Sequence, residues 1–211
     1  MHRPIRHLVL LAGILSLNGC ISLVSTPTMS TTTYVLSPPA SPVTPLGASS
    51  GRVLYVARAV APAYLEGTRI VFSRDDLTRN AYQYAQWAEP LPAQVTTLLV
   101  EALEATNYFS AVTRHSGVAV PDLTLVLEIL DFRHRAEPLP GEATVTLRGT
   151  LSDRREGSIV KATTVTKSVP VAEGSARAAV TALGEAAAQS LAAIVAMVVG
   201  VSSDTPTVPA R

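Results

Sequence analysis

The only cysteine of the chain, Cys20, stands at the end of its first apolar segment. Residues 8–17 form a mainly apolar stretch of ten residues, with Arg3 and Arg6 before it and Gly19 directly before the cysteine. A basic start followed by a short apolar run is typical of a secretory signal, and this run is too short to span a membrane. A thiol after a small residue at this place is where bacterial lipoproteins are acylated. We therefore predict a signal peptide over 1–19 and lipidation of Cys20.

Two neighbours of the cysteine refine this prediction. Asn18 departs from the lipobox pattern, which more often has a small or weakly polar residue there, and an ordinary secretory signal remains the alternative. Ile21 follows the cysteine, and the absence of Asp at this position favours the periplasmic face of the outer membrane over the inner membrane. Two or three acyl chains, each contributing about 0.8 kcal/mol per buried methylene, give a stable anchor.

Few other residues have the type and spacing needed for chemistry. After the signal, the histidines are His115 and His134, which fall on different predicted elements, and His134 lies between two arginines. Asp75 and Asp76 could serve as acid and base, but adjacent carboxylates in a turn are more often solvated or cap a helix. The chain has no nucleophile motif of the Gly-x-Ser-x-Gly kind and no phosphate-binding loop. We expect no metal site, no cofactor and no enzymatic activity.

Composition limits the classes of partner. Of 211 residues, 47% are apolar, which is enough for one core, and the formal net charge is +1. Removing Arg3 and Arg6 with the signal brings this charge near −1, and no basic stripe with interleaved aromatics suggests nucleic-acid binding. Ser, Thr and Pro make up eighteen of residues 21–50. Such a segment buries too little apolar surface to order itself, so we predict a tether over 20–50. A flexible tail is predicted over 201–211.

Between these segments, residues 51–200 alternate strands and helices. Strands are predicted at 52–59, 68–73, 80–87, 123–133, 143–153 and 159–169, with 34–36 as a short additional strand at a sheet edge. Pro90 and Pro92 open a helix that ends near Asn107, because Val95, Leu98, Leu99, Ala102 and Leu103 recur at helical spacing. An alanine-rich helix is predicted over 175–199. The order of elements predicts an α+β fold, a mainly antiparallel or mixed sheet with two helices packed on one face.

The alanine-rich helix has an alternative interpretation as a membrane span. Glu185 and Gln189 interrupt it, and only residues 191–201 run without a strongly polar side chain. That length is short of the roughly twenty residues that a span needs. We therefore expect the helix to pack on the sheet.

Several short motifs in a fixed order resemble the ABC-type transport auxiliary lipoprotein family, the PqiC-like proteins. After the lipobox at Cys20 come Tyr34, Leu36 and Pro39, and then the segment 60–65 with Pro62, Tyr64 and Leu65. Residues 69–72 follow, and residues 86–91 contain Trp-Ala-Glu-Pro-Leu at the start of the first helix. The order and spacing match over about 34–110, and the match is weaker beyond that.

The resemblance implies a periplasmic lipoprotein that serves a lipid-trafficking system. Relatives accompany an ABC permease, an ATPase and a substrate-binding protein of the MCE type, which move phospholipids or related molecules between the membranes. An MCE-type protein is therefore the implied partner, together with the membrane that holds the acyl chains of Cys20. Self-association is plausible by the same resemblance. The alternative function is an outer-membrane lipoprotein that regulates a cell-wall synthase, since a long tether suits that role too.

The resemblance also suggests where a partner would bind. Tyr64 and Leu65 are apolar residues in a proline-flanked loop, which often marks a contact surface. Trp87 is the third candidate. The alternative at all three positions is a purely structural role. The loop can fold the side chains of Tyr64 and Leu65 inward, and Trp87 can pack on the sheet.

Overall fold

The computed structural model describes residues 30–37, 49–115, 117 and 120–204, the last four by backbone only. The described residues from Thr31 onward belong to one compact unit. Its strands are β1 (Thr32–Tyr34), β2 (Val53–Val56), β3 (Arg69–Ser73), β4 (Asn80–Trp87), β5 (Ala111–Thr113), β6 (Leu123–Arg135), β7 (Glu142–Asp153) and β8 (Ser158–Pro170). Its helices are the short 3-10 helix η2 (Ala63–Leu65), α2 (Leu91–Ala105) and α3 (Ala176–Asp204). The predicted signal, most of the predicted tether and Cys20 lie outside the described residues.

The long strand β6 organises the mixed eight-stranded sheet. Along one edge of β6, β2 pairs in parallel near its start and β3 pairs in parallel near its end. Along the other edge, β7 pairs antiparallel over almost the full length, and β8 continues the sheet beyond β7. The remaining strands complete the order β1-β4-β3-β6-β2-β5. The structure thus confirms the predicted α+β fold with a mixed, mainly antiparallel sheet.

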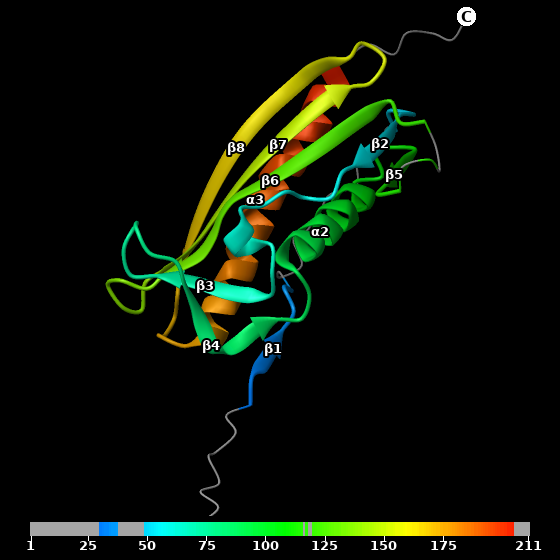
Figure 1. The fold of residues 1–211 in the computed structure, drawn as a ribbon. Helices are drawn as coiled ribbons and strands as arrows, with labels where there is room; N and C mark the ends of the chain where they lie inside the picture. The colour runs from blue at the N-terminus through cyan, green and yellow to red at the C-terminus, as the bar shows by residue number, and fades with distance from the viewer. Residues whose placement is uncertain (1–29, 38–48, 116, 118–119, 205–211) are drawn as a thin grey trace, which may run out of the picture. The chain divides into compact units, whose positions relative to one another are not determined.

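Both helices cover the same face of this sheet (Figure 1), because the apolar residues of the long strands alternate toward it. α3 packs on β7 and β8, and α2 packs against α3 and β5. The fully buried residues of β6 and β7 include Leu123, Leu125, Leu127, Ile129, Val145, Leu147 and Leu151. Burying alternate residues of paired strands against amphipathic helices forms the single core.

A register shift between Ile129 and Asp131 changes the alternation of β6. Before the shift, odd-numbered residues such as Ile129 face the helices. After it, Phe132 and His134 face inward, whereas Asp131 and Arg133 lie on the helix-free face. A β-bulge inserts one extra residue and so re-aims every side chain that follows. Without it, three charged side chains at the end of β6 would point into the core.

The helices start and stop close to their predicted limits. Pro90 is the N-cap of α2 and Pro92 lies in its first turn, where a missing N–H costs nothing. After α2, Asn107 adopts a positive φ of 51°, which ends the helix because asparagine tolerates the left-handed region. α3 runs to Asp204, four residues into the predicted tail. Its residues 176–200 are long and apolar enough to cross a membrane, yet the helix packs on the sheet and over half of that apolar window is buried.

The fold also begins before residue 51. β1 pairs in parallel with the end of β4, from Thr32 opposite Ala85 to Tyr34 opposite Trp87. The backbone N–H of Leu36, a buried residue, donates to Oε1 of Gln94 on α2 at 2.8 Å. The predicted edge strand at 34–36 is therefore present two residues earlier, and residues within the predicted tether belong to the sheet.

Candidate functional site

The structure places the three predicted contact residues in different environments. Leu65 and Trp87 are each 1% exposed and belong to the core, whereas Tyr64 is half-buried. Of the three, Tyr64 alone has a side chain that a partner can reach in this structure. Leu65 and Trp87 can act only by supporting the surface around it.

Local hydrogen bonds hold Leu65 inward. Its N–H donates to the Pro62 carbonyl at 2.8 Å and closes the turn of η2. Glu66 accepts the N–H of Ala61 at 3.3 Å and forms an ion pair with Arg58 at 3.0 Å. These contacts fold the loop back on itself, so that Leu65 packs into the core while Tyr64 stays at the rim.

Trp87 joins the sheet to the first helix. Its N–H donates to the Thr68 carbonyl at 2.7 Å, and the next N–H, of Ala88, donates to the Tyr34 carbonyl at 2.7 Å. Its ring meets Phe132 of β6 edge-on, with ring centres 6.2 Å apart. An aromatic ring buried in this way contributes to stability by its area and by ring geometry. The residue fixes the start of α2.

The turn between β3 and β4 reaches the exposed side of Tyr64. The Arg79 guanidinium carbon lies 5.8 Å from the centre of the Tyr64 ring, within the range of a cation–π contact. Leu77, in the same turn, has 95% of its surface exposed. We call Tyr64, Leu77 and Arg79 the Tyr64 surface. Sequence analysis missed Leu77 and Arg79, because a turn carries no periodic pattern that would show which side chains face outward.

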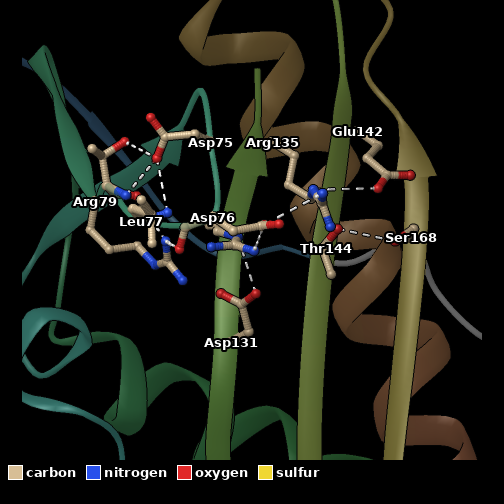
Figure 2. Close-up of polar contacts among 11 residues, drawn as sticks. Asp75, Asp76, Leu77, Arg79, Asp131, Arg135, Glu142, Thr144 and Ser168 are labelled. Carbon is tan, nitrogen blue, oxygen red and sulfur yellow. Dashed lines mark hydrogen bonds and ion pairs between the residues drawn. The ribbon is translucent and has the colours of Figure 1, made fainter. Parts of the chain in front are cut away.

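The two adjacent carboxylates at 75 and 76 build this turn. Asp75 Oδ1 accepts the N–H groups of Leu77 and Thr78 at 2.9 and 2.7 Å and the Thr78 hydroxyl at 2.8 Å (Figure 2). The Thr78 hydroxyl, followed by its backbone N–H, lowers the pKa of Asp75 below its ordinary value. These hydrogen bonds make the exposed Asp75 the organiser of an Asx turn. The sequence favoured a solvated or helix-capping pair over acid–base chemistry, and the Asx turn is a further structural role that was not predicted.

Asp76 ties the same turn to the helix-free face of β6. Its Oδ1 lies 3.3 Å from Nη2 of Arg133 and 3.5 Å from Nη2 of Arg135 (Figure 2). Arg135 also lies 3.9 Å from Glu142 on β7, and Nε of Arg133 lies 3.1 Å from Oδ2 of Asp131. The turn that carries Leu77 and Arg79 is thus held on the sheet by a network of charges on adjacent strands.

The centre of this network is buried. Only 7% of the Arg133 side chain is exposed, and its Nε and Nη1 have no hydrogen bond among the described residues. The Arg133–Asp131 contact is therefore an ion pair without an aligned hydrogen bond. Burial raises the pKa of Asp131, and the positive charge of Arg133 partly opposes that rise. The sequence signal for this cluster was the charged run at the end of an otherwise alternating strand.

The two histidines lie in unrelated places. His134 is buried, with Nδ1 2.6 Å from the Tyr82 hydroxyl and Nε2 2.7 Å from the Pro140 carbonyl. This arrangement fits a neutral ring whose Nδ1 accepts a hydrogen bond from the Tyr82 hydroxyl and whose Nε2–H donates to the Pro140 carbonyl. His115 is exposed and lines an open cavity of about 290 Å³ with Glu101, Glu104 and Arg114. Within the described ranges, no three His, Cys, Asp or Glu residues gather as a metal site.

Comparison with known proteins places this fold in a family. The model of a family described as an ABC-type transport auxiliary lipoprotein component matches residues 34–195, most of the chain. The chain belongs to this family. The match begins at the last residue of β1 and covers most of α3, and so includes the C-terminal half where the sequence resemblance was weaker. No sequence among the curated proteins matches the chain.

Solved structures share the fold at low sequence identity. A Xanthomonas campestris protein matches with a TM-score of 0.73 at 23% identity, over 82% of this chain and 97% of that one. An uncharacterised protein matches with a TM-score of 0.64 at 20% identity, over 80% and 99%. A hypothetical protein of Chlamydia trachomatis matches with a TM-score of 0.53 at 15% identity, over 73% and 99%. At these identities the likeness establishes the fold and nothing about partners.

Proposed function

We propose that this protein is an accessory subunit of an ABC-type system that moves lipid between the inner and outer membranes. Acyl chains on Cys20 hold it at the periplasmic face of the outer membrane, and its partner is an MCE-type substrate-binding protein. It binds and positions other components and catalyses no reaction of its own. The observation that carries this proposal is the family match over residues 34–195, which includes β2 to β8, the last residue of β1 and most of α3.

The lipoprotein signal supports the membrane part of the proposal. The basic start, the apolar stretch over 8–17 and Gly19 before Cys20 stand in the order that lipidation requires. Ile21 in place of Asp supports the outer membrane. The family description names a lipoprotein, in agreement with this signal.

The Tyr64 surface is the proposed docking point. The Tyr64 ring in η2 lies under the Arg79 guanidinium of the β3–β4 turn, and the same turn carries the exposed Leu77, so the surface offers a π face, a cation and apolar area. Tyr and Arg are enriched at the energetic centres of interfaces because they bury large surfaces and also form directed polar contacts. The network around Arg133 holds the turn in place before a partner arrives, which lowers the ordering cost of binding.

Capture of partners by the acylated protein tests the proposal. A tagged chain is expressed in its own host, cross-linked, extracted from membranes with detergent and purified, and the partners are identified by mass spectrometry. We expect an MCE-type protein, and we expect Tyr64→Ala to reduce its recovery several-fold. Tyr84→Ala is the matched control, because Tyr84 is a tyrosine of β4 outside the Tyr64 surface, and its side chain is exposed.

Two results would contradict the proposal. Recovery of a cell-wall synthase without transporter components would favour the alternative function. Equal recovery of the MCE-type protein by native chain and Tyr64→Ala would leave the transporter role standing but move the docking point elsewhere.

A further inference from the structure

β8 is an open edge of the sheet. In the part of the chain that the structure describes, β8 pairs with β7 along one side and with no strand along the other. It runs for 13 residues, and Figure 1 shows it at the outer limit of the sheet, with α3 behind it. A long unpaired strand edge is a template for the addition of another strand, which proteins usually blunt or cover.

The register shows which backbone groups of β8 point outward. The N–H of Val171 donates to the carbonyl of Gly141 at 2.9 Å, so this opposed pair is hydrogen-bonded. Hydrogen-bonded and non-hydrogen-bonded pairs alternate in antiparallel strands. Ala143 with Val169 is therefore bonded, whereas Thr144 with Ser168 is not. The residues of β8 whose N–H and C=O groups face away from β7 are Ala162, Thr164, Thr166 and Ser168.

Three details agree with this assignment. Pro170, which has no N–H, takes an outward position, where strands tolerate proline. The hydroxyls of Thr144 and Ser168 lie 3.0 Å apart, and those of Thr146 and Thr166 also lie 3.0 Å apart. Side chains approach most closely in non-hydrogen-bonded pairs, so these contacts mark the same positions.

The charge on this edge has one sign. Lys161 and Lys167 are the charged residues of β8, and neither forms an ion pair with any described residue. They lie on one face of the strand, six positions and roughly 20 Å apart at about 3.4 Å per residue. If another strand were added antiparallel to β8, both lysines would lie in non-hydrogen-bonded pairs with it, and side chains approach most closely in such pairs.

These charges limit what can occupy the edge. If two β8 strands paired antiparallel about Thr164, Lys161 of each copy would lie opposite Lys167 of the other, and like charges directly opposite are unfavourable. The segments of the chain outside the described residues contain no Asp or Glu, so none of them can supply the missing countercharges. Pairing with a second copy in this register is therefore unfavourable, whereas a strand of another protein that carries acidic residues can meet both lysines.

We propose that β8 binds an extended acidic segment of a partner protein by β-strand addition. Backbone hydrogen bonds to Ala162, Thr164, Thr166 and Ser168 supply affinity. Two carboxylates spaced six residues apart, opposite Lys161 and Lys167, supply the choice of partner and fix its register. This surface is separate from the Tyr64 surface, and the proposal does not depend on the transport system in which the protein works.

A designed peptide tests the proposal on the full acylated chain in detergent. The probe is a nine-residue peptide of alternating Thr and Val with Glu at its second and eighth positions, and its control carries Lys at both. We expect fluorescence anisotropy to show the Glu peptide binding about tenfold more tightly, since two attractive pairs replace two repulsive ones. Hydrogen exchange should show new protection at the outward amides of β8.

Charge reversal makes the test sharper. Lys161→Glu with Lys167→Glu should invert the preference, so that the Lys peptide binds more tightly than the Glu peptide. Arg69→Glu with Arg74→Glu, at the start of β3 and just after its end, is the matched control of equal charge change, and it should keep the native preference. Thr166→Pro removes one outward N–H without removing a bond to β7 and should weaken both peptides.

Several results would overturn the proposal. These are equal affinity for the two peptides, an unchanged preference after charge reversal, and bound peptide without protection of the outward amides. Concentration-dependent self-association that protects the same amides, measured by sedimentation and hydrogen exchange, would assign this edge to a second copy instead.

Discussion

Tyr64 and Leu65 are neighbours in one 3-10 turn and have different roles. The Leu65 side chain is fully buried among the core residues, whereas the Tyr64 ring lies under Arg79 at the rim. Successive residues in such a tight turn point in different directions, so a single apolar pair can supply both a core residue and a contact residue. Testing the pair as one unit would mix loss of stability with loss of binding.

Separate substitutions should resolve these roles. Leu65→Ala should lower the free energy of unfolding by about 2–5 kcal/mol, because it removes buried methyl groups and leaves a cavity. Tyr64→Ala should lower it by clearly less, because the ring is only partly buried. Urea denaturation monitored by circular dichroism measures both. A loss below 1 kcal/mol for Leu65→Ala would contradict its position in the core.

Asp131 gives the buried charge cluster a testable pH dependence. Folding raises the pKa of this carboxyl above its ordinary value of 3.8, chiefly through burial. The folded state therefore keeps the proton to higher pH than the unfolded chain does. The stabilisation from this group is complete below the unfolded pKa and is lost as pH rises through the folded pKa.

Asp131→Asn isolates that effect. The free energy of unfolding of the native chain, relative to the variant, should fall as pH rises from about 3.5 to about 7, because only the native chain has to ionise a buried carboxyl. Urea titrations of both proteins across this range provide the measurement. A difference that stays constant, or that grows in favour of the native chain, would mean that Arg133 outweighs burial.

At the scale of elements, α3 depends on small residues where it crosses the sheet. A Cβ at Gly149 of β7 would lie 3.1 Å from Cδ1 of Ile194 and 3.3 Å from Cε of Met197. Ala179, Ala182, Ala186 and Ala187 are buried on the facing side of the helix. Small side chains on both elements let the helix axis come close to the sheet, and the close packing leaves no room for added atoms.

Gly149→Val should therefore strain the contact and destabilise the fold by about 1–3 kcal/mol. Ile194→Ala opens space at the same point, so the double variant should lose less stability than the two single variants added together. Gly67→Ala is the control, since a Cβ there meets no atom within 4 Å and the residue has an ordinary φ. Urea denaturation of the native chain, the two single variants and the double variant gives the coupling free energy between positions 149 and 194. Additive losses would show that α3 does not press on β7 at this glycine.

At the scale of the whole molecule, only eleven residues separate Cys20, the predicted lipidation site, from the first strand of the fold. β1 starts at Thr32 and pairs with β4, and the N–H of Leu36 bonds to Gln94 of α2. The predicted tether therefore contains a structural segment, and the link between Cys20 and the first strand is shorter than the composition suggested.

Cys20→Ser should abolish this anchoring, because only a thiol accepts the diacylglycerol. We expect the variant to leave the membrane fraction or to accumulate as an unprocessed precursor, while its melting temperature in purified form stays near that of the native chain. Fractionation, immunoblotting and intact mass measure these outcomes. Native material that begins at Met1, or that carries an unmodified Cys20, would contradict the prediction.

The sequence alone was enough to predict the order of elements and the class of fold. Alternation over 123–129 and the paired Thr/Val-rich strands indicated the sheet, and Pro90, Pro92 and Asn107 indicated both ends of the first helix. These signals are local, since each depends on the period of a strand or helix or on a residue that only a helix end tolerates. The lipidation signal is local in the same way and stays a prediction.

Tertiary structure decided the features that depend on distant residues. The bulge at Leu130 moved Asp131 and Arg133 to the helix-free face, where Asp76 of the β3–β4 turn forms an ion pair with Arg133. Parallel pairing of β2 and β3 with the two ends of β6 has no sequence signal, because register depends on which strands meet in space. The burial of Leu65 and Trp87, the exposure of Leu77 and the open edge of β8 follow from that assembly, since the exposure of a side chain is set by its neighbours in three dimensions.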